Sequence, residues 1–371
     1  MKQIVYADNA ATTKLDKDAF EAMKPFLLDN YANASQPYSF SRDAKKALKE
    51  ARQIIANCIN AEPNEIFFTS CGSESDNWAI KGVAYNDKQG AIITSEIEHH
   101  AILRSCADVE KRGVPVAYIK PNKEGVITPE LLLDYITKKT KMVSVMFVNN
   151  EIGTIEPIKE LCEVAHSKGA LFHTDAVQAV GHIDINVKEL GVDMLSASAH
   201  KFNGPKGIGF LYIKKGTNII PFINGGSQEF GYRAGTENVA AIVGMATALK
   251  KNYDSISENN KYLEHLEKLL LKELEPLDFS RNGFNHSRGI ISLSFPNQDG
   301  ETILHRLDLM GVMVSTGAAC DNVSTQISHV LSAIGLEESL AKGTIRISLS
   351  KSNTEEDIYC IANALKKIIK E

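Results

Sequence analysis

Short apolar runs alternate with longer amphipathic stretches along the first two thirds of the chain, a pattern typical of a sheet wrapped by helices. Runs rich in β-branched or aromatic residues predict strands over 65–69, 91–94, 142–148, 170–174, 194–197 and 207–213. Apolar positions three or four apart predict helices over 41–59, 129–138 and 157–167. Crossovers of this length imply an α/β fold with a largely parallel sheet, in which ligands lie beyond the carboxyl ends of the strands.

The pattern changes after Val239, where a long charged helical tract covers 240–274. Strands are predicted over 290–295 and 344–349, and helices over 301–310 and 355–369, so this part of the chain indicates a compact α+β unit. We therefore expect a large domain over residues 15–255 and a smaller domain formed by residues 1–14 and 256–371.

Composition narrows the possible partners and location. The 371 residues are 43% hydrophobic and 23% charged, enough to bury a full core, and the net charge of −5 argues against a nucleic acid or an anionic membrane as a direct partner. No export signal or membrane-spanning apolar run occurs, so we expect a cytoplasmic protein. The six cysteines are scattered, which predicts neither a disulfide framework nor a metal site.

Lys201 lies between an apolar strand and a turn punctuated by glycines, with small residues around it. A lysine that forms an imine must be held, desolvated and flanked by groups that bind an anionic cofactor, and Ser198 and His200 supply such groups. Pyridoxal 5'-phosphate is the cofactor that fits this setting. The alternative is a surface lysine where a strand passes into a loop.

Further polar clusters follow other predicted strands. Asp175 could hold a pyridine nitrogen protonated and Gln178 could reach the phenolic oxygen of the ring, although each could instead cap the next helix. Residues 69–75 follow a strand and open a helix, so their backbone N–H groups and hydroxyls form a natural phosphate cradle, or a plain helix cap. Only together do these clusters indicate one cofactor site.

Three more segments extend this pattern. His99 could stack on the ring or carry protons, and Asn150 offers an amide to a cofactor oxygen, while the alternatives are a structural histidine and a polar turn. Small residues surround Cys320 in the segment 314–324, as expected of a mobile loop that presents a thiol, although a buried cysteine in a tight turn would read the same way.

The motifs occur in collinear order over nearly the whole chain. They are Tyr6 to Thr13, Thr69 to Asn77, Glu98-His99, Val148 to Gly153, Asp175 to Gln178, Ser198 to Lys201, Arg233 to Asn238, Ser315 to Cys320 and Ser328 to Leu331. As a set they resemble the cysteine desulfurases of the class V, aminotransferase-fold (fold type I) pyridoxal phosphate enzymes. The length of the Cys320 segment is similar to that of the NifS/IscS group.

The resemblance implies a role for each matching residue. Lys201 would form the imine with the cofactor, and Cys320 would receive the sulfur of L-cysteine as a persulfide and pass it to an acceptor protein. Thr236 would reach the phosphate in the other subunit of a homodimer. Arg346 and Asn33 would bind the substrate carboxylate. The ring would contact His99, Asp175, Asn150 and Gln178, and the phosphate would contact Ser73, Ser198, His200 and the backbone of Gly72.

The chain departs from the usual family pattern at several positions: Tyr38, Ser41, Cys71, Phe230, Asp321 and Ser350-Lys351. Alternative activities are a selenocysteine lyase, another class V transaminase, or a non-catalytic partner with the same fold in a sulfur-transfer assembly. Possible acceptors are an iron–sulfur cluster assembly scaffold, a tRNA thiolation enzyme and a DNA phosphorothioation system.

Overall fold

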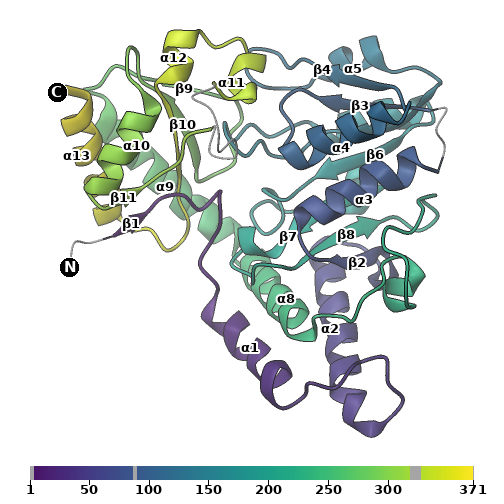
Figure 1. Cartoon of the computed structure of the whole chain (residues 1–371). Helices are drawn as coiled ribbons and strands as arrows, with labels where there is room; N and C mark the ends of the chain where they lie inside the picture. Colours follow the sequence, from purple (N-terminus) through teal and green to yellow (C-terminus); the bar gives the residue numbers. More distant parts are fainter. Residues whose placement is uncertain (1–3, 87–89, 318–326, 371) are drawn as a thin grey trace.

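A seven-stranded sheet forms the centre of the computed structural model, which describes residues 4–86, 90–317 and 327–370 (Figure 1). Its strand order is β2-β8-β7-β6-β5-β3-β4. The strands are β2 (Ile66–Thr69), β3 (Ala91–Ser95), β4 (Val116–Ile119), β5 (Thr140–Ser144), β6 (Leu171–Asp175), β7 (Met194–Ser198) and β8 (Gly209–Ile213). Neighbouring strands are parallel except where β8 pairs with β2 and β7. The predicted α/β fold with a mostly parallel sheet is therefore confirmed.

Both faces of this sheet are buried under helices. Phe67 and Met194 pack in a cluster with Trp78 of α3, whereas the next residues along the same strands, Phe68 and Leu195, pack in a second cluster. Successive side chains of a strand point to opposite faces of the sheet, so each of these strands contributes side chains to both clusters. The helices of this part are α1 (Lys17–Leu28), α2 (Arg42–Cys58), α3 (Gly72–Ala84), α4 (His100–Lys111), α5 (Pro129–Tyr135), α6 (Ile158–Ser167), α7 (Val187–Leu190) and α8 (Val239–Asp254).

The second unit lies beside the first and carries both ends of the chain (Figure 1). It contains the antiparallel sheet β12-β10-β9 and the parallel pair β1-β11. Val5 and Ala7 share its core with Leu365 and Ile368, so residues near the two ends of the described chain pack together. Its elements are β1 (Val5–Tyr6), α9 (Ile256–Leu274), β9 (Ser280–Arg281), β10 (Ile290–Ser294), α10 (Gly300–Leu309), β11 (Val312–Met313), α11 (His329–Ala333), α12 (Glu338–Lys342), β12 (Thr344–Ser348) and α13 (Glu355–Lys370). The domain boundaries given above stay a prediction.

Several predicted elements differ from the observed ones. The tract 240–274 is two helices that meet at Ser255, whose backbone is not helical (φ −117, ψ 9). Strand β5 ends at Ser144 rather than at residue 148, although Phe147 N still donates to Asp175 O at 2.9 Å, so the chain runs on beside β6 without a full ladder. Among the described residues, no helix combines the length and apolarity needed to cross a membrane.

One close approach fixes the loop that precedes α3. A Cβ atom at Gly209, the first residue of β8, would lie 2.5 Å from Ala197 O and 3.0 Å from the carbonyl carbon of Cys71. Only glycine therefore lets β8 pass between β7 and the Cys71 backbone. The start of α3 is thereby held against the end of β7, where Ser198 lies.

Candidate active site

A cavity of about 390 Å³ lies where the strand ends of the seven-stranded sheet face the second unit. Strands β2, β3, β5, β6 and β7 run in the same direction, so the segments that follow them meet at one edge. The predicted site residues that line this cavity are Gly72, Ser73, His99, Asn150, Asp175, Gln178, Ser198, His200, Lys201 and Arg346.

Lys201 ends a 3-10 turn, Ala199–Lys201, that follows β7 directly. Its Nζ donates to the carbonyl oxygens of Ala10 at 2.5 Å and Ala11 at 2.9 Å. Gln178 Nε2 donates to the same Ala10 oxygen at 2.9 Å. Neutral carbonyl groups of the N-terminal segment therefore accept hydrogen bonds from the amine. Breaking these bonds costs less free energy than breaking bonds to a carboxylate would.

Two buried carboxyl groups line the cavity. Asp175, at the end of β6, is 4% exposed and accepts from Val177 N at 2.9 Å, and burial raises its pKa to about 6. Asp76 of α3 is 1% exposed, its Oδ1 has no hydrogen-bond partner, and burial followed by the charge of Asp175 raises its pKa well above the usual range. A cationic ring nitrogen placed beside Asp175 would offset this cost.

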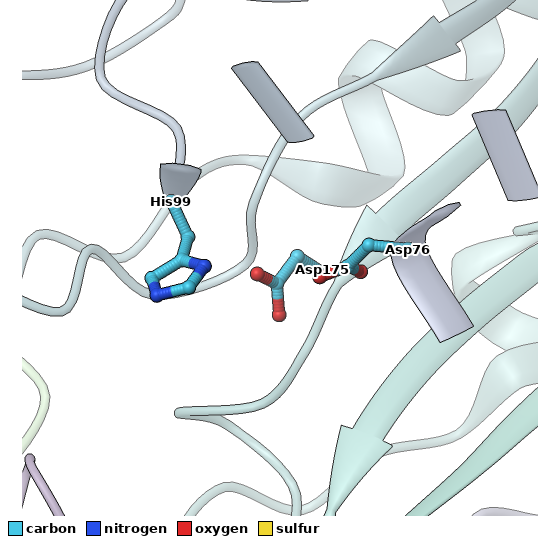
Figure 2. A group of neighbouring side chains, drawn as sticks. All are labelled: Asp76, His99 and Asp175. Atoms are coloured by element: carbon cyan, nitrogen blue, oxygen red, sulfur yellow. The ribbon is translucent and has the colours of Figure 1, made fainter. Parts of the chain in front are cut away.

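His99 is the N-cap residue that precedes α4, and its ring faces these carboxyls (Figure 2). Its Nδ1 accepts from Ala101 N at 3.1 Å, so a neutral ring carries its proton on Nε2. Burial, and then the charge of Lys201, lowers the pKa of His99 to about 4, so the ring is neutral at pH 7. Figure 2 shows His99, Asp175 and Asp76 turned toward one space.

One ligand atom from each of these three residues lies within 4.8 Å of the others, a group that could hold a metal ion. The same positions suit an aromatic cation. A flat imidazole can stack on the face of a pyridine ring, and a carboxylate can accept a hydrogen bond from the protonated ring nitrogen. A second group of lining residues shows which of these ligands, a metal ion or an aromatic cation, fits the cavity better.

This second group of lining residues is suited to an anion. Gly72 and Ser73 open the 13-residue helix α3, whose first backbone N–H groups point out of the helix. Ser198 Oγ is buried without a hydrogen-bond partner, and a Cβ at Gly72 would lie 2.7 Å from Val177 Cγ2. The orphaned hydroxyl and the absence of a side chain at residue 72 fit a phosphate group. The cavity therefore offers one group of residues suited to a phosphate and another suited to a protonated ring nitrogen.

Arg346 of β12 brings the second unit into the site. Its guanidinium is 7% exposed and donates to Asp8 Oδ1 and to Asn150 O, each at 2.8 Å. Arg346 Nε has no hydrogen-bond partner. A guanidinium with a donor to spare is suited to a carboxylate.

Other predicted residues are not brought to this cavity. Asn33 Oδ1 accepts from Ser35 N at 2.8 Å, and Thr236 is exposed on the surface; neither lines the cavity of its own chain. Cys320 and Asp321 lie outside the described residues. The residues that precede Cys320 do line the cavity: Ser315, Thr316 and Gly317.

The departures from the family pattern fall in different surroundings. Cys71 lines the cavity, whereas Tyr38 is 50% exposed outside it. Phe230 is 59% exposed, with a φ of 59°, and its ring lies 5.2 Å from the Arg52 guanidinium carbon. Lys351 Nζ donates to Asn252 Oδ1 at 2.9 Å.

The prediction missed several residues that line the cavity, among them Asp8, Asp76, Glu151 and His329. Asp76 follows Gly72 by four residues, one helical turn, and so lies on the same face of α3. That spacing could have revealed it. Glu151 is adjacent to Asn150 in the same post-strand segment, and only its burial distinguishes it from an exposed turn carboxylate.

Comparison with known proteins agrees with this geometry. Residues 5–360 match the aminotransferase class-V family. The chain is 49% identical to the cysteine desulfurase IscS of Clostridium botulinum over 383 residues, covering 100% of this chain and 96% of the relative.

Two solved structures are also similar. A NifS-like protein has a TM-score of 0.94 and 38% identity, covering 99% of this chain and 100% of its own. SspA in complex with cysteine has a TM-score of 0.85 and 36% identity, covering 95% of this chain and 100% of the SspA chain. The chain therefore belongs to the aminotransferase class-V family and, within it, to the pyridoxal-phosphate-dependent cysteine desulfurases.

Proposed function

We propose that this protein converts L-cysteine to L-alanine and that Cys320 takes the sulfur as a persulfide for transfer to an acceptor protein. The observation that supports this most is the meeting of two distant segments at one cavity: Lys201 and residues 315–317, which lead to Cys320, both line it. The name of the SspA complex includes cysteine as a ligand of that similar structure, which favours the same substrate here.

The cofactor would be held at both ends by groups already described. Ser73, Ser198, His200 and the backbone of Gly72 would bind its phosphate, and Asp175 would pair with its ring nitrogen. His99 would lie against the ring, and Asn150 and Gln178 near its phenolic oxygen. Pyridoxal phosphate would supply an electron sink, because it withdraws electrons from the α-carbon of an amino acid whose amine has taken the place of Lys201.

The protein's own groups would then carry the reaction. Lys201, displaced by the substrate amine, removes the α-proton as a general base. The Cys320 thiolate attacks the substrate sulfur, so a sulfur–sulfur bond forms and the bond between sulfur and the β-carbon breaks. The electron pair of the broken bond stays with the β-carbon, which takes up a proton. Cysteine plus a thiol thus gives alanine plus a persulfide.

Arg346 and Asn33 would bind the substrate carboxylate. The unpartnered Nε of Arg346 gives this guanidinium a donor beyond those committed to Asp8 and Asn150. His99 suits a proton carrier, because its Nε2–H is fixed by the bond that Nδ1 accepts and because its neutral form dominates at pH 7.

We further propose a homodimer in which Thr236 reaches the phosphate site of the partner subunit. Thr236 is exposed and does not line the cavity of its own chain, as a residue that serves a second copy would be. The sulfur acceptor would be a protein of iron–sulfur cluster assembly, tRNA thiolation or DNA phosphorothioation, and the reaction would take place in the cytoplasm.

The direct test is to incubate the purified holoenzyme with L-cysteine and measure alanine, sulfide and the mass of the Cys320 peptide. We expect alanine in step with the gain of one sulfur atom on that peptide. Cys320→Ala should abolish sulfide release and leave the cofactor absorbance intact, while Cys360→Ala, in α13, serves as the matched control.

The alternatives give different results. The activity of a transaminase would be unchanged by Cys320→Ala and would require a keto acid. A selenocysteine lyase would turn over selenocysteine but not cysteine. A non-catalytic partner would show no turnover with either.

A further inference from the structure

Glu151 is a buried carboxyl group that the reaction above does not use. It is 4% exposed and lines the cavity, one residue after Asn150. Asn149 fixes its backbone, because Asn149 Oδ1 accepts from Glu151 N at 2.9 Å and from Ile152 N at 3.0 Å. Asn149 Nδ2 in turn donates to Ile97 O at 2.9 Å, so the turn is tied to the segment after β3. The position from which the Glu151 side chain departs is therefore set by the sheet edge.

The Glu151 side chain reaches the second unit at two points that flank Cys320 in the sequence. Ser328 Oγ donates to Glu151 Oε2 at 2.5 Å. The same oxygen lies against Gly317, since a Cβ built there would come within 2.3 Å of Oε2. Gly317 precedes Cys320 by three residues and Ser328 follows it by eight. One carboxylate oxygen thus contacts both described ends of the cysteine segment.

Each of these ends is also anchored to an element of the second unit. Ser315 pairs with Arg346 of β12 through Ser315 N to Arg346 O at 3.1 Å and Arg346 N to Ser315 O at 2.7 Å. Ser328 Oγ accepts from Val330 N at 3.1 Å and so caps α11. Glu151 therefore joins the end of a strand pairing and the start of a helix to the edge of the large sheet.

We propose that Glu151 is a positioning residue for the segment that carries Cys320: by accepting from Ser328 and packing against Gly317 with one carboxylate oxygen, it fixes the two described ends from which that segment departs. This inference rests on the proposed role of Cys320. This role of Glu151 needs no proton transfer. The glycine at 317 follows from the same contact, because any side chain there would occupy the place of the carboxylate.

The reaction offers a way to separate positioning from general damage. Binding of L-cysteine to the cofactor changes its absorbance without Cys320, whereas persulfide formation requires Cys320. In the holoenzyme, Glu151→Ala should slow persulfide formation by about 10- to 100-fold, the usual cost of a misplaced reacting group. The rate of the absorbance change should stay unchanged. Glu151→Gln keeps an oxygen that accepts from Ser328 and should lose no more than about fivefold, since one neutral hydrogen bond replaces a charged one.

Gly317 provides an internal check on the contact. Gly317→Ala in the wild-type background places a methyl group 2.3 Å from Glu151 Oε2 and should slow persulfide formation. In the Glu151→Ala background only Ser328 Cβ, at 3.1 Å, still lies close to the methyl group, so the second substitution should add much less than it costs in the wild-type background. Such non-additivity is the signature of a direct contact.

A measurement that needs no turnover completes the test. The alkylation rate of Cys320 by iodoacetamide, followed on its peptide with Cys360 as internal reference, should change in Glu151→Ala and in Ser328→Ala. Two controls should match wild type: Ser332→Ala, an exposed serine of α11, and Glu160→Ala, an exposed glutamate of α6. Should Glu151→Ala not fold, Glu151→Gln and Ser328→Ala give the same comparison.

Wild-type alkylation and persulfide rates in these variants would overturn the inference. So would an absorbance change slowed in proportion to persulfide formation, because the defect would then precede Cys320. Failure of the proposed function is a separate outcome: sulfide release by Cys320→Ala would refute the role of the thiol, whatever the alkylation rates show.

Discussion

Replacing Asp175 with asparagine should stabilise the cofactor-free protein and weaken the holoenzyme. Burial raises the pKa of Asp175 from 3.8 to about 6, against the opposing effects of the Val177 N–H and the Lys201 charge. Each unit of pKa corresponds to about 1.4 kcal/mol, so the ionised carboxyl costs the cofactor-free fold about 3 kcal/mol. Asparagine keeps an oxygen for Val177 N and removes the charge. It also removes the repulsion that Asp175 exerts on Asp76.

The sign of the pH dependence follows from the raised pKa. Between the unfolded pKa of 3.8 and the folded pKa of about 6, the folded protein binds the proton more tightly, so stability falls as pH rises. Above pH 6 the full cost is present. The advantage of Asp175→Asn should therefore be about 3 kcal/mol at pH 8 and about half of that at pH 5.

The assay is urea unfolding of the cofactor-free proteins at both pH values. Trp78 is the single tryptophan of the chain and is fully buried in α3, so its fluorescence reports unfolding. In parallel, absorbance titration with pyridoxal phosphate should show a dissociation constant raised about 10- to 100-fold, because a charge-assisted hydrogen bond is lost. A variant less stable than wild type at pH 8, or a gain that is the same at pH 5, would refute the reasoning.

Three further substitutions test the site and its frame. Ser198→Ala removes a buried hydroxyl that has no partner, so it should weaken cofactor binding yet change the unfolding free energy of the cofactor-free protein by less than about 1 kcal/mol; a larger loss would contradict this. Gly72→Ala should lower cofactor affinity about tenfold in absorbance titrations, because its methyl group meets Val177, and adding Val177→Ala should restore the affinity. Glu229→Gln removes the buried charged partner that binds the partly buried Arg52 guanidinium with both oxygens, and should cost about 3 kcal/mol in urea unfolding; a change below about 1 kcal/mol would contradict this.

Much of the site could be predicted because it depends on strand ends. Asp175 and Ser198 each end a parallel strand, so identifying the strands was enough to bring the two residues together. The antiparallel direction of β8 could also have been predicted, because the short stretch between Ser198 and Gly209 leaves no room for a crossover helix. The roles of the matched residues stay predictions that the experiments above address.

What the sequence did not reveal depends on side-chain direction and on contacts between distant segments. Asp76 and Glu151 lie in motifs that were recognised, but their burial follows from how α3 and the Asn149 turn pack against the rest of the molecule. The pairing of Ser315 with Arg346 joins parts of the second unit through tertiary contacts that no local pattern encodes. Asn33 and Thr236 have positions that the fold of a single chain does not bring to the cavity.

The pairing of β1 with β11 has a consequence for synthesis. Val5 lies opposite Val312, and Asn9 Nδ2 donates to Ser348 O at 2.9 Å, so β1 finds its neighbours only after the long segment between them has been synthesised. A product cut short before Val312 carries an N-terminal strand with an open edge, the feature that invites intermolecular pairing. Premature termination should therefore yield aggregates rather than a partly working catalyst.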